Sequence, residues 1–394
     1  MHFFRRLSSP LHLATSIICL ACIILPGFAV AKMHFSPVLL LDQEYTDNYF
    51  RSEIDQAEFW VTQISPGFGW EFFTDRSRVN LDYAFSYFWN NSPDGNIDAS
   101  KQDYPGHDLN FYAGYRGSSR LTLALSDVFY LTREPALTDE FSNIVDRNKY
   151  WRNRVEPFIT YDIGEKGEAK LGYRNDQLQW LEQRPEQENS SENRGILTLT
   201  YHLNDTNHLD LDGQFWNRDY DGIQSDYNSY QAVLIYRREF TSSWKGEVGA
   251  GYQGRDFEDP NFKDLDEPVF YLGLKGDTGV SKLEFLLQHN LVDYTLGDEY
   301  FTALRGDLYA EHMFLEKIRA YLGGYYQFSD FTTGPREDNT FNGRVGLGYL
   351  FLHKMFELGL EYSYNQRDSN DAASDYTENR VFLSLKLVYD FASK

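Results

Sequence analysis

Apolar and polar side chains alternate along this chain with a period of two residues. In the stretch 78–90 every second side chain is large and apolar, and the residues between them are mostly small or polar. Similar alternation recurs at 109–115, 318–326, 345–351, 356–364 and 380–391. A period of two is that of a β-strand with one apolar and one polar face. The pattern therefore predicts many β-strands, each with one face suited to lipid and the other to water.

Short and long connections alternate between these segments. The short ones, rich in turn-forming residues, fall at 74–77, 117–119, 164–167, 204–207, 241–243, 277–279, 315–317 and 353–354. The longer polar ones fall at 46–56, 91–106, 134–150, 181–193, 221–226, 257–267, 297–300, 332–339 and 369–377. The segments between them predict an all-β fold, a transmembrane antiparallel up-and-down β-barrel of about 18 strands with periplasmic turns and both termini periplasmic.

Three positions leave room for irregular strands. Pro66 and Pro157 fall inside predicted strands, where a proline removes a backbone hydrogen-bond donor. Asp127 shares a predicted strand face with the leucines at 121–125, which allows a bulge or a slip in register.

The first 31 residues have the pattern of a cleaved secretory signal peptide. Arg5 and Arg6 precede an apolar run over 11–28, and the small residues at 29–31 form a cleavage site. The mature protein is then a single barrel domain, 32–394. Cys19 and Cys22 fall within the signal, so their spacing predicts no redox or metal site.

Composition favours a barrel over a bundle of membrane helices. Beyond the signal there is no run of about 18 apolar residues, which a membrane helix needs. Aromatic residues make up 17% of the chain, enough for aromatic belts at two membrane interfaces. Among the tryptophans, Trp60, Trp89, Trp151, Trp180 and Trp216 fall toward the loop ends of strands, and Trp70 and Trp244 toward the turn ends. The general preference of aromatics for strands is the alternative explanation.

The net charge of −22 is concentrated in the long loops. Nucleic acid is not expected as a partner, because that needs a basic surface. The loops lack the spacing of a calcium-binding loop, so we interpret them as a solvated surface and expect no metal or cofactor.

Charged residues on the polar strand faces are the candidate lining of the barrel interior. They are Asp82, Arg116, Arg154, Glu156, Asp210, Asp212, Arg305, Asp307, Arg319, Glu357, Glu361 and Arg380. The two signs are nearly balanced, so mutual neutralisation in a packed or plugged lumen is one interpretation. A barrel of about 18 strands is, however, wide enough for an aqueous channel. Aromatic residues on the same faces, namely Tyr112, Phe158, Trp216, Tyr321 and Tyr325, suit a neutral or mixed-charge glycan.

Evidence for catalysis is scarce. The segment 249–254 matches G-x-G-x-x-G, but it lies inside an alternating segment with no helix after it, so it does not predict dinucleotide binding. His312 beside Glu311, or His289 near Asn290, could belong to a hydrolase site on a strand face. No catalytic set is visible, and an enzyme is the less favoured interpretation.

The last segment, 380–391, resembles the C-terminal recognition strand of bacterial outer-membrane barrels. Tyr389 and Phe391 are the candidate assembly signal, although three residues follow Phe391. The resemblance implies the barrel assembly machinery as a partner, together with outer-membrane lipid and lipopolysaccharide.

Several segments resemble the putative β-barrel porin 2 family. They are 37–41, 45–50, 64–68, 78–89 and 127–135. The resemblance implies an outer-membrane barrel connected with exopolysaccharide export and its components, and it carries over no catalytic residue. Two functions remain open: a porin-like channel for polysaccharide or polar solutes, and a non-conducting surface barrel acting in adhesion or envelope assembly through its acidic loops.

Overall fold

The computed structural model describes residues 32–95, 97–135, 147–182, 187–293, 300–332 and 334–389, and the backbone of 391–392. The predicted signal peptide lies outside the described residues. So do parts of five predicted loops, at 96, 136–146, 183–186, 297–299 and 333.

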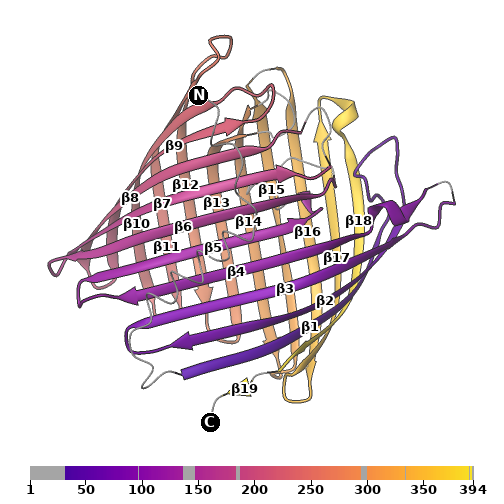
Figure 1. The fold of residues 1–394 in the computed structure, drawn as a ribbon, viewed down its shortest axis with the longest axis horizontal. Coiled ribbons are helices and arrows are strands. Elements are labelled where there is room, and N and C mark those ends of the chain that lie inside the picture. Colours follow the sequence, from indigo (N-terminus) through magenta and orange to yellow (C-terminus); the bar gives the residue numbers. More distant parts are fainter. Residues whose placement is uncertain are drawn as a thin grey trace, which may run out of the picture.

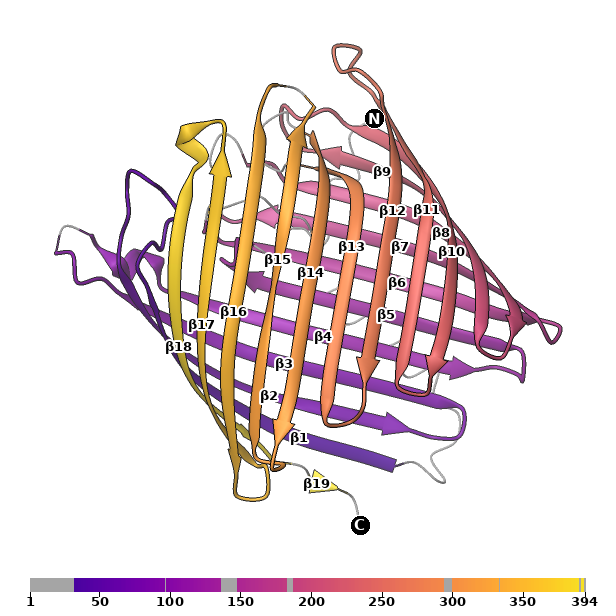
Figure 2. The same ribbon diagram turned by 180° about the vertical axis from the view of Figure 1, so that it is seen from behind.

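Eighteen long antiparallel strands form a closed barrel, in which each strand pairs with its sequence neighbours and β18 pairs with β1. The first nine are β1 (Lys32–Thr46), β2 (Phe59–Phe73), β3 (Ser77–Asn91), β4 (Tyr104–Arg116), β5 (Leu121–Thr132), β6 (Tyr150–Ile163), β7 (Gly167–Trp180), β8 (Ser190–Asn204) and β9 (Asn207–Tyr220). The others are β10 (Tyr227–Thr241), β11 (Trp244–Phe257), β12 (Leu265–Asp277), β13 (Ser281–Asp293), β14 (Tyr300–Phe314), β15 (Ile318–Phe331), β16 (Glu337–Phe351), β17 (Phe356–Ser369) and β18 (Tyr376–Val388). Strands β2–β9 form one side of the barrel and β12–β18 the opposite side (Figures 1 and 2). The predicted fold class and strand number are confirmed.

The connections separate into two kinds at the two ends of the barrel. At the turn end, two to four residues join the strands, as at 205–206 and 352–355. At the loop end the connections are longer, and two of them contain short 3₁₀ helices, η2 (Ala99–Gln102) and η4 (Ala372–Ser374). None of the helices among the described residues is long and apolar enough to cross a membrane. Strand β1 begins and β18 ends at the turn end, and a two-residue strand, β19 (Phe391–Ala392), pairs with the start of β1. That this end is periplasmic stays a prediction.

The strand pairing is interrupted where the sequence predicts it. The ladder between β2 and β3 skips Pro66, and the ladder between β6 and β7 skips Pro157. At Asp127 the predicted bulge is absent, because β5 pairs with both neighbours in continuous register. Its carboxylate instead accepts a hydrogen bond of 2.6 Å from Asn153 Nδ2, which satisfies a buried carboxylate among apolar neighbours.

The pairing of β12 with β13 stops early, at Phe270 and His289, after eight residue pairs. Pro268 has no N–H to offer β13, and its carbonyl accepts a 2.7 Å hydrogen bond from the ring of His289 instead. Beyond this point β13 leaves β12 and bends inward, where the carbonyl of Leu291 lies 3.5 Å from Gln253 Nε2 on β11. The end of β13 therefore lies against the inner wall.

The two strand faces differ as the alternation predicts. Apolar side chains such as Leu171, Leu211 and Leu360 point outward and are between 49% and 59% exposed. Trp180 and Trp216, expected in the outer aromatic belt, are instead buried in apolar clusters, and Trp216 lines an interior cavity. That expectation was wrong for both residues, because they stand on the polar parity of β7 and β9.

Candidate functional site

Most of the predicted lumen residues are paired with groups on the same strand or on a strand one or two positions away in the barrel. Arg154 lies 2.8 Å from Asp176, Glu156 2.9 Å from Arg174, Arg305 2.7 Å from Asp307, and Arg380 2.7 Å from Glu44. Arg319 pairs with Glu357, Asp210 accepts from Thr200 and Arg237, Asp212 accepts from Thr198 and Gln214, and Glu361 accepts from Tyr321. The charges are therefore arranged as local pairs along the wall.

Two predicted lumen residues stand apart from these pairs. Asp82 on β3 and Arg116 at the turn end of β4 are both exposed. They line neither of the two cavities described below.

One cavity, of about 600 Å³, lies in the half of the barrel nearer the loops; we call it the loop-half cavity. Its wall contains Arg152, Arg154, Arg174, Arg194, Arg218 and Arg255, together with Asp176, Glu192 and Asp293. Asp293, at the end of β13 that bends inward, forms ion pairs with Arg218 and, at 2.6 Å, with Arg255, and it accepts a 2.6 Å hydrogen bond from the hydroxyl of Tyr227. Arg152, Arg174, Arg194 and Arg218 were not among the predicted lumen residues, although their even-numbered positions on β6–β9 carry the same signal as Arg154.

A second cavity, of about 890 Å³, lies toward the turns; we call it the turn-half cavity. Arg305 and Asp307, both predicted, line it. In all, six lysines and arginines and five carboxylates stand on its wall, so its charge is nearly balanced. His202 and His208, which face each other across the β8–β9 hairpin, line it with their Nδ1 atoms 2.7 Å apart.

The inward aromatic rings do not form an open platform. A guanidinium lies 4.1 Å from the ring of Trp216, 3.8 Å from that of Tyr325 and 5.0 Å from that of Tyr321. The ammonium of Lys170 lies 4.3 Å from the ring of Phe158. Since a cation occupies these faces, ring stacking on a neutral sugar is a weaker basis for recognition than the sequence suggested.

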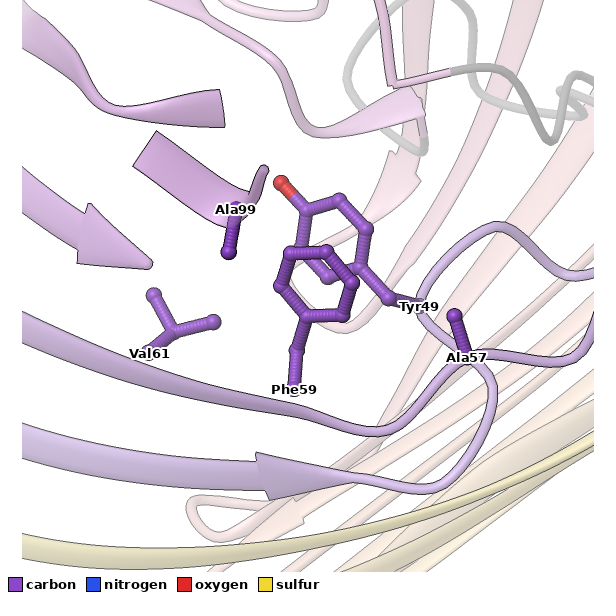
Figure 3. Packing of buried hydrophobic residues seen from close by; sticks show 5 residues of the cluster. All are labelled: Tyr49, Ala57, Phe59, Val61 and Ala99. Carbon is purple, nitrogen blue, oxygen red and sulfur yellow. The ribbon is translucent and has the colours of Figure 1, made fainter. Parts of the chain in front are cut away.

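A buried apolar cluster lies at the loop end of the barrel. The connection between β1 and β2 places Tyr49 against Phe59, with ring centroids 4.1 Å apart, and Ala57, Val61 and Ala99 complete the group (Figure 3). The guanidinium of Arg147, from the connection between β5 and β6, lies 4.6 Å from the Tyr49 ring.

A charged cluster beside it, which we call the mouth cluster, ties three parts of the chain together. Glu378 on β18 is fully buried and is bonded by Arg51 at 2.9 Å and Arg147 at 3.2 Å, while Arg380 lies 3.9 Å away. Glu134 lies 3.8 Å from both Arg51 and Arg147. Burial alone would raise the pKa of Glu134, but the two guanidinium groups outweigh it and hold that pKa below its usual value.

The groups considered for catalysis do not assemble. His312 bonds to Ser281 at 2.7 Å, whereas Glu311 bonds to the hydroxyl of Tyr309 on the alternate face. His289 is used by the Pro268 carbonyl, and the segment 249–254 lies within β11. Within the described ranges, no group of three or more His, Cys, Asp or Glu side chains could hold a metal ion.

The closed 18-stranded antiparallel sheet defines the class of fold, an up-and-down β-barrel of the kind found in outer membranes. More particularly, the profile of the family described as Putative beta-barrel porin 2 matches residues 211–389. The predicted family resemblance is thereby confirmed, although the segments that suggested it all precede residue 211.

Solved structures give the same fold. OccK9 (OpdG) of Pseudomonas aeruginosa has a TM-score of 0.50 and 14% identity, over 91% of this chain and 98% of that one. OccK2 (OpdF) of the same organism, in complex with glucuronate, has a TM-score of 0.49 and 13% identity, over the same shares. OccAB4 of Acinetobacter baumannii has a TM-score of 0.48 and 12% identity, again over the same shares. No curated protein matches the chain.

Proposed function

We propose that this barrel is a channel for polar solutes and that it serves the passage of exopolysaccharide. The observation that supports this most is the interior itself: two cavities of about 600 and 890 Å³ with charged walls lie inside one closed barrel. A lumen that only filled space would not need water-accessible ion pairs, since apolar packing is as stable or more so. The exopolysaccharide link is supported by the family resemblance alone.

Ion conductance of the purified barrel in planar bilayers tests the channel. We expect single-channel steps in a protein that shows heat-modifiable migration on SDS gels. A correctly folded barrel that passes no current at any voltage would contradict a channel. It would favour the second candidate, a non-conducting surface barrel, which the contacts that fix the loop-end connections to one another and to β18 support.

We also propose that Tyr389 and Phe391 signal assembly. The amide of Tyr389 bonds to the carbonyl of Pro37 at 3.1 Å, which continues the last strand along β1 toward β19. The variant Phe391→Ser should then lower the amount of barrel inserted in the outer membrane, while cleavage after Ala31 proceeds. Normal insertion of this variant would show that targeting does not depend on Phe391.

A further inference from the structure

The charge of the loop-half cavity is opposite to that of the chain. The protein carries a net charge of −22, yet this wall has six arginines against three carboxylates. The arginines come from five strands, β6, β7, β8, β9 and β11, so they form an arc along one side of the lumen. Field lines concentrate in such a low-dielectric enclosure, and a positive wall therefore raises the local concentration of anions.

The six arginines divide into two groups by burial. The side chains of Arg152, Arg218 and Arg255 are at most 9% exposed and bond to the carboxylates of Asp176, Glu192 and Asp293. Their charges are compensated within the wall. Arg154, Arg174 and Arg194, on the successive strands β6, β7 and β8, are 40%, 23% and 18% exposed and face the cavity.

The three cavity-facing arginines use only some of their N–H donors in the hydrogen bonds of the wall. Each guanidinium has five N–H groups. Among the described residues, Arg174 uses its Nε on Glu156, and Arg194 uses Nε on Glu192 and Nη1 on Gln214. Arg154 directs Nε and Nη2 to Asp176. The remaining Nη groups can bind a further carboxylate or phosphate oxygen, for which the planar fork of arginine is well suited.

The rest of the wall fits a saccharide rather than a bare ion. Gln214, Gln231, Gln253, Asn290 and Tyr130 also line the cavity. These amides and the phenol both donate and accept hydrogen bonds, as sugar hydroxyls require. Since neighbouring strands lie about 4.8 Å apart, three arginines on successive strands present positive charges at short intervals, which suits a ligand with repeated negative charges.

We infer that the loop-half cavity binds an extended acidic saccharide through Arg154, Arg174 and Arg194. The inference rests on the proposed function, since it names the class of solute for the same lumen. It differs from the neutral or mixed-charge glycan that the balanced sequence pattern suggested.

Calorimetry on the detergent-solubilised full barrel tests the site without requiring conductance. The probes are an oligogalacturonate, an uncharged malto-oligosaccharide of the same length, and linear polyphosphate. We expect oligogalacturonate to bind at least about tenfold more tightly than the other two, a difference of about 1.4 kcal/mol, and to weaken as salt is added. Equal binding of oligogalacturonate and the uncharged sugar, or stronger binding of polyphosphate, would overturn the inference.

Three variants locate the binding. The double variant Arg174→Gln with Arg194→Gln should weaken oligogalacturonate binding by about tenfold or more. Arg174→Lys keeps the charge but loses the fork, and should give an intermediate loss. Lys101→Gln removes an exposed positive charge at the loop end outside the cavity and is the matched control, expected to bind as the parent does.

Unchanged binding by the double variant would overturn the inference, and heat-modifiable migration checks that each variant folds. Bilayer recordings then separate the two proposals. Binding without any current would contradict the channel but support the acidic-saccharide site, whereas current without selective binding would do the opposite.

Discussion

Strand β13 carries an acidic side chain into each cavity, and the two carboxylates differ sharply. At its loop end, Asp293 has a side chain that is 5% exposed and is bonded by two arginines and a tyrosine. At its turn end, Glu284 is 48% exposed and contacts Lys275, 66% exposed, at 2.7 Å. Both carboxylates form ion pairs, but only those of Asp293 are shielded from solvent.

The comparison shows that ion pairs of similar residue types contribute differently to the free energy of unfolding when one is buried and the other is exposed. Removing one partner of a buried pair leaves an uncompensated charge and costs about 3–5 kcal/mol. A solvent-exposed pair contributes about 0–1 kcal/mol. Asp293 is therefore a buried charge that holds the end of β13 against the inner wall, whereas the pair of Glu284 and Lys275 is screened by solvent. Selectivity by position is expected in the loop half and little in the turn half.

The largest effect is expected at Asp293. Asp293→Ala leaves Arg218 and Arg255 buried without their shared carboxylate, and both already have an Nε with no acceptor among the described residues. We expect a loss of about 3–5 kcal/mol, measured by urea unfolding in detergent. A loss no larger than that of Glu284→Gln would remove the distinction between the halves.

The mouth cluster should respond next. Glu378→Gln keeps the size of the side chain but removes the charge that Arg51 and Arg147 share. We expect the connection 47–58 to loosen, with trypsin cleavage after Arg51 faster by about tenfold if about 1.4 kcal/mol is lost. Glu337→Gln, on an exposed residue at the same end, serves as the control. Equal cleavage rates would show that Glu378 does not hold this loop.

A smaller effect is expected at the turn end. Glu284→Gln breaks the exposed pair with Lys275 and should change the unfolding free energy by less than about 1 kcal/mol. The same urea titration measures it. A loss comparable to that of Asp293→Ala would mean that the turn half is as desolvated as the loop half.

The smallest effect concerns pH. Because the folded pKa of Glu134 is lowered, its contribution is fully present above the unfolded pKa of about 4.3 and is lost as pH falls through the folded value. Hydrogen exchange in the connection 47–58, corrected for its intrinsic pH dependence, should therefore increase below about pH 4. Glu134→Gln should reduce that increase, and an unchanged profile would exclude Glu134 as a cause.

The alternation of residues was sufficient to predict the barrel and the local pairs on its wall. Parity places Arg154 and Glu156 inside, and each then meets a partner on the next strand because the register is regular. Trp216 shows that a position near the end of a strand is not sufficient to place a tryptophan in the aromatic belt. Its parity on β9 places the side chain inside the barrel, where it lines the loop-half cavity.

Other parts could not be predicted from local sequence. Asp293 has the wrong parity for the lumen and reaches it because β13 leaves β12 after His289. The mouth cluster joins Glu378 to Arg147, 231 positions apart in sequence. Contacts of that kind depend on how loops fold over a closed barrel, and no periodicity along one strand encodes them.

The short ladder between β12 and β13 has a consequence for how the barrel comes apart. Its eight residue pairs are fewer than those between any other adjoining long strands that the structure describes. Local opening is most frequent where the fewest backbone hydrogen bonds hold two strands together. The amides between β12 and β13 should therefore be the first in the barrel wall to exchange with deuterated solvent. Pro268 would thereby determine which strand of the closed barrel first exposes a free edge.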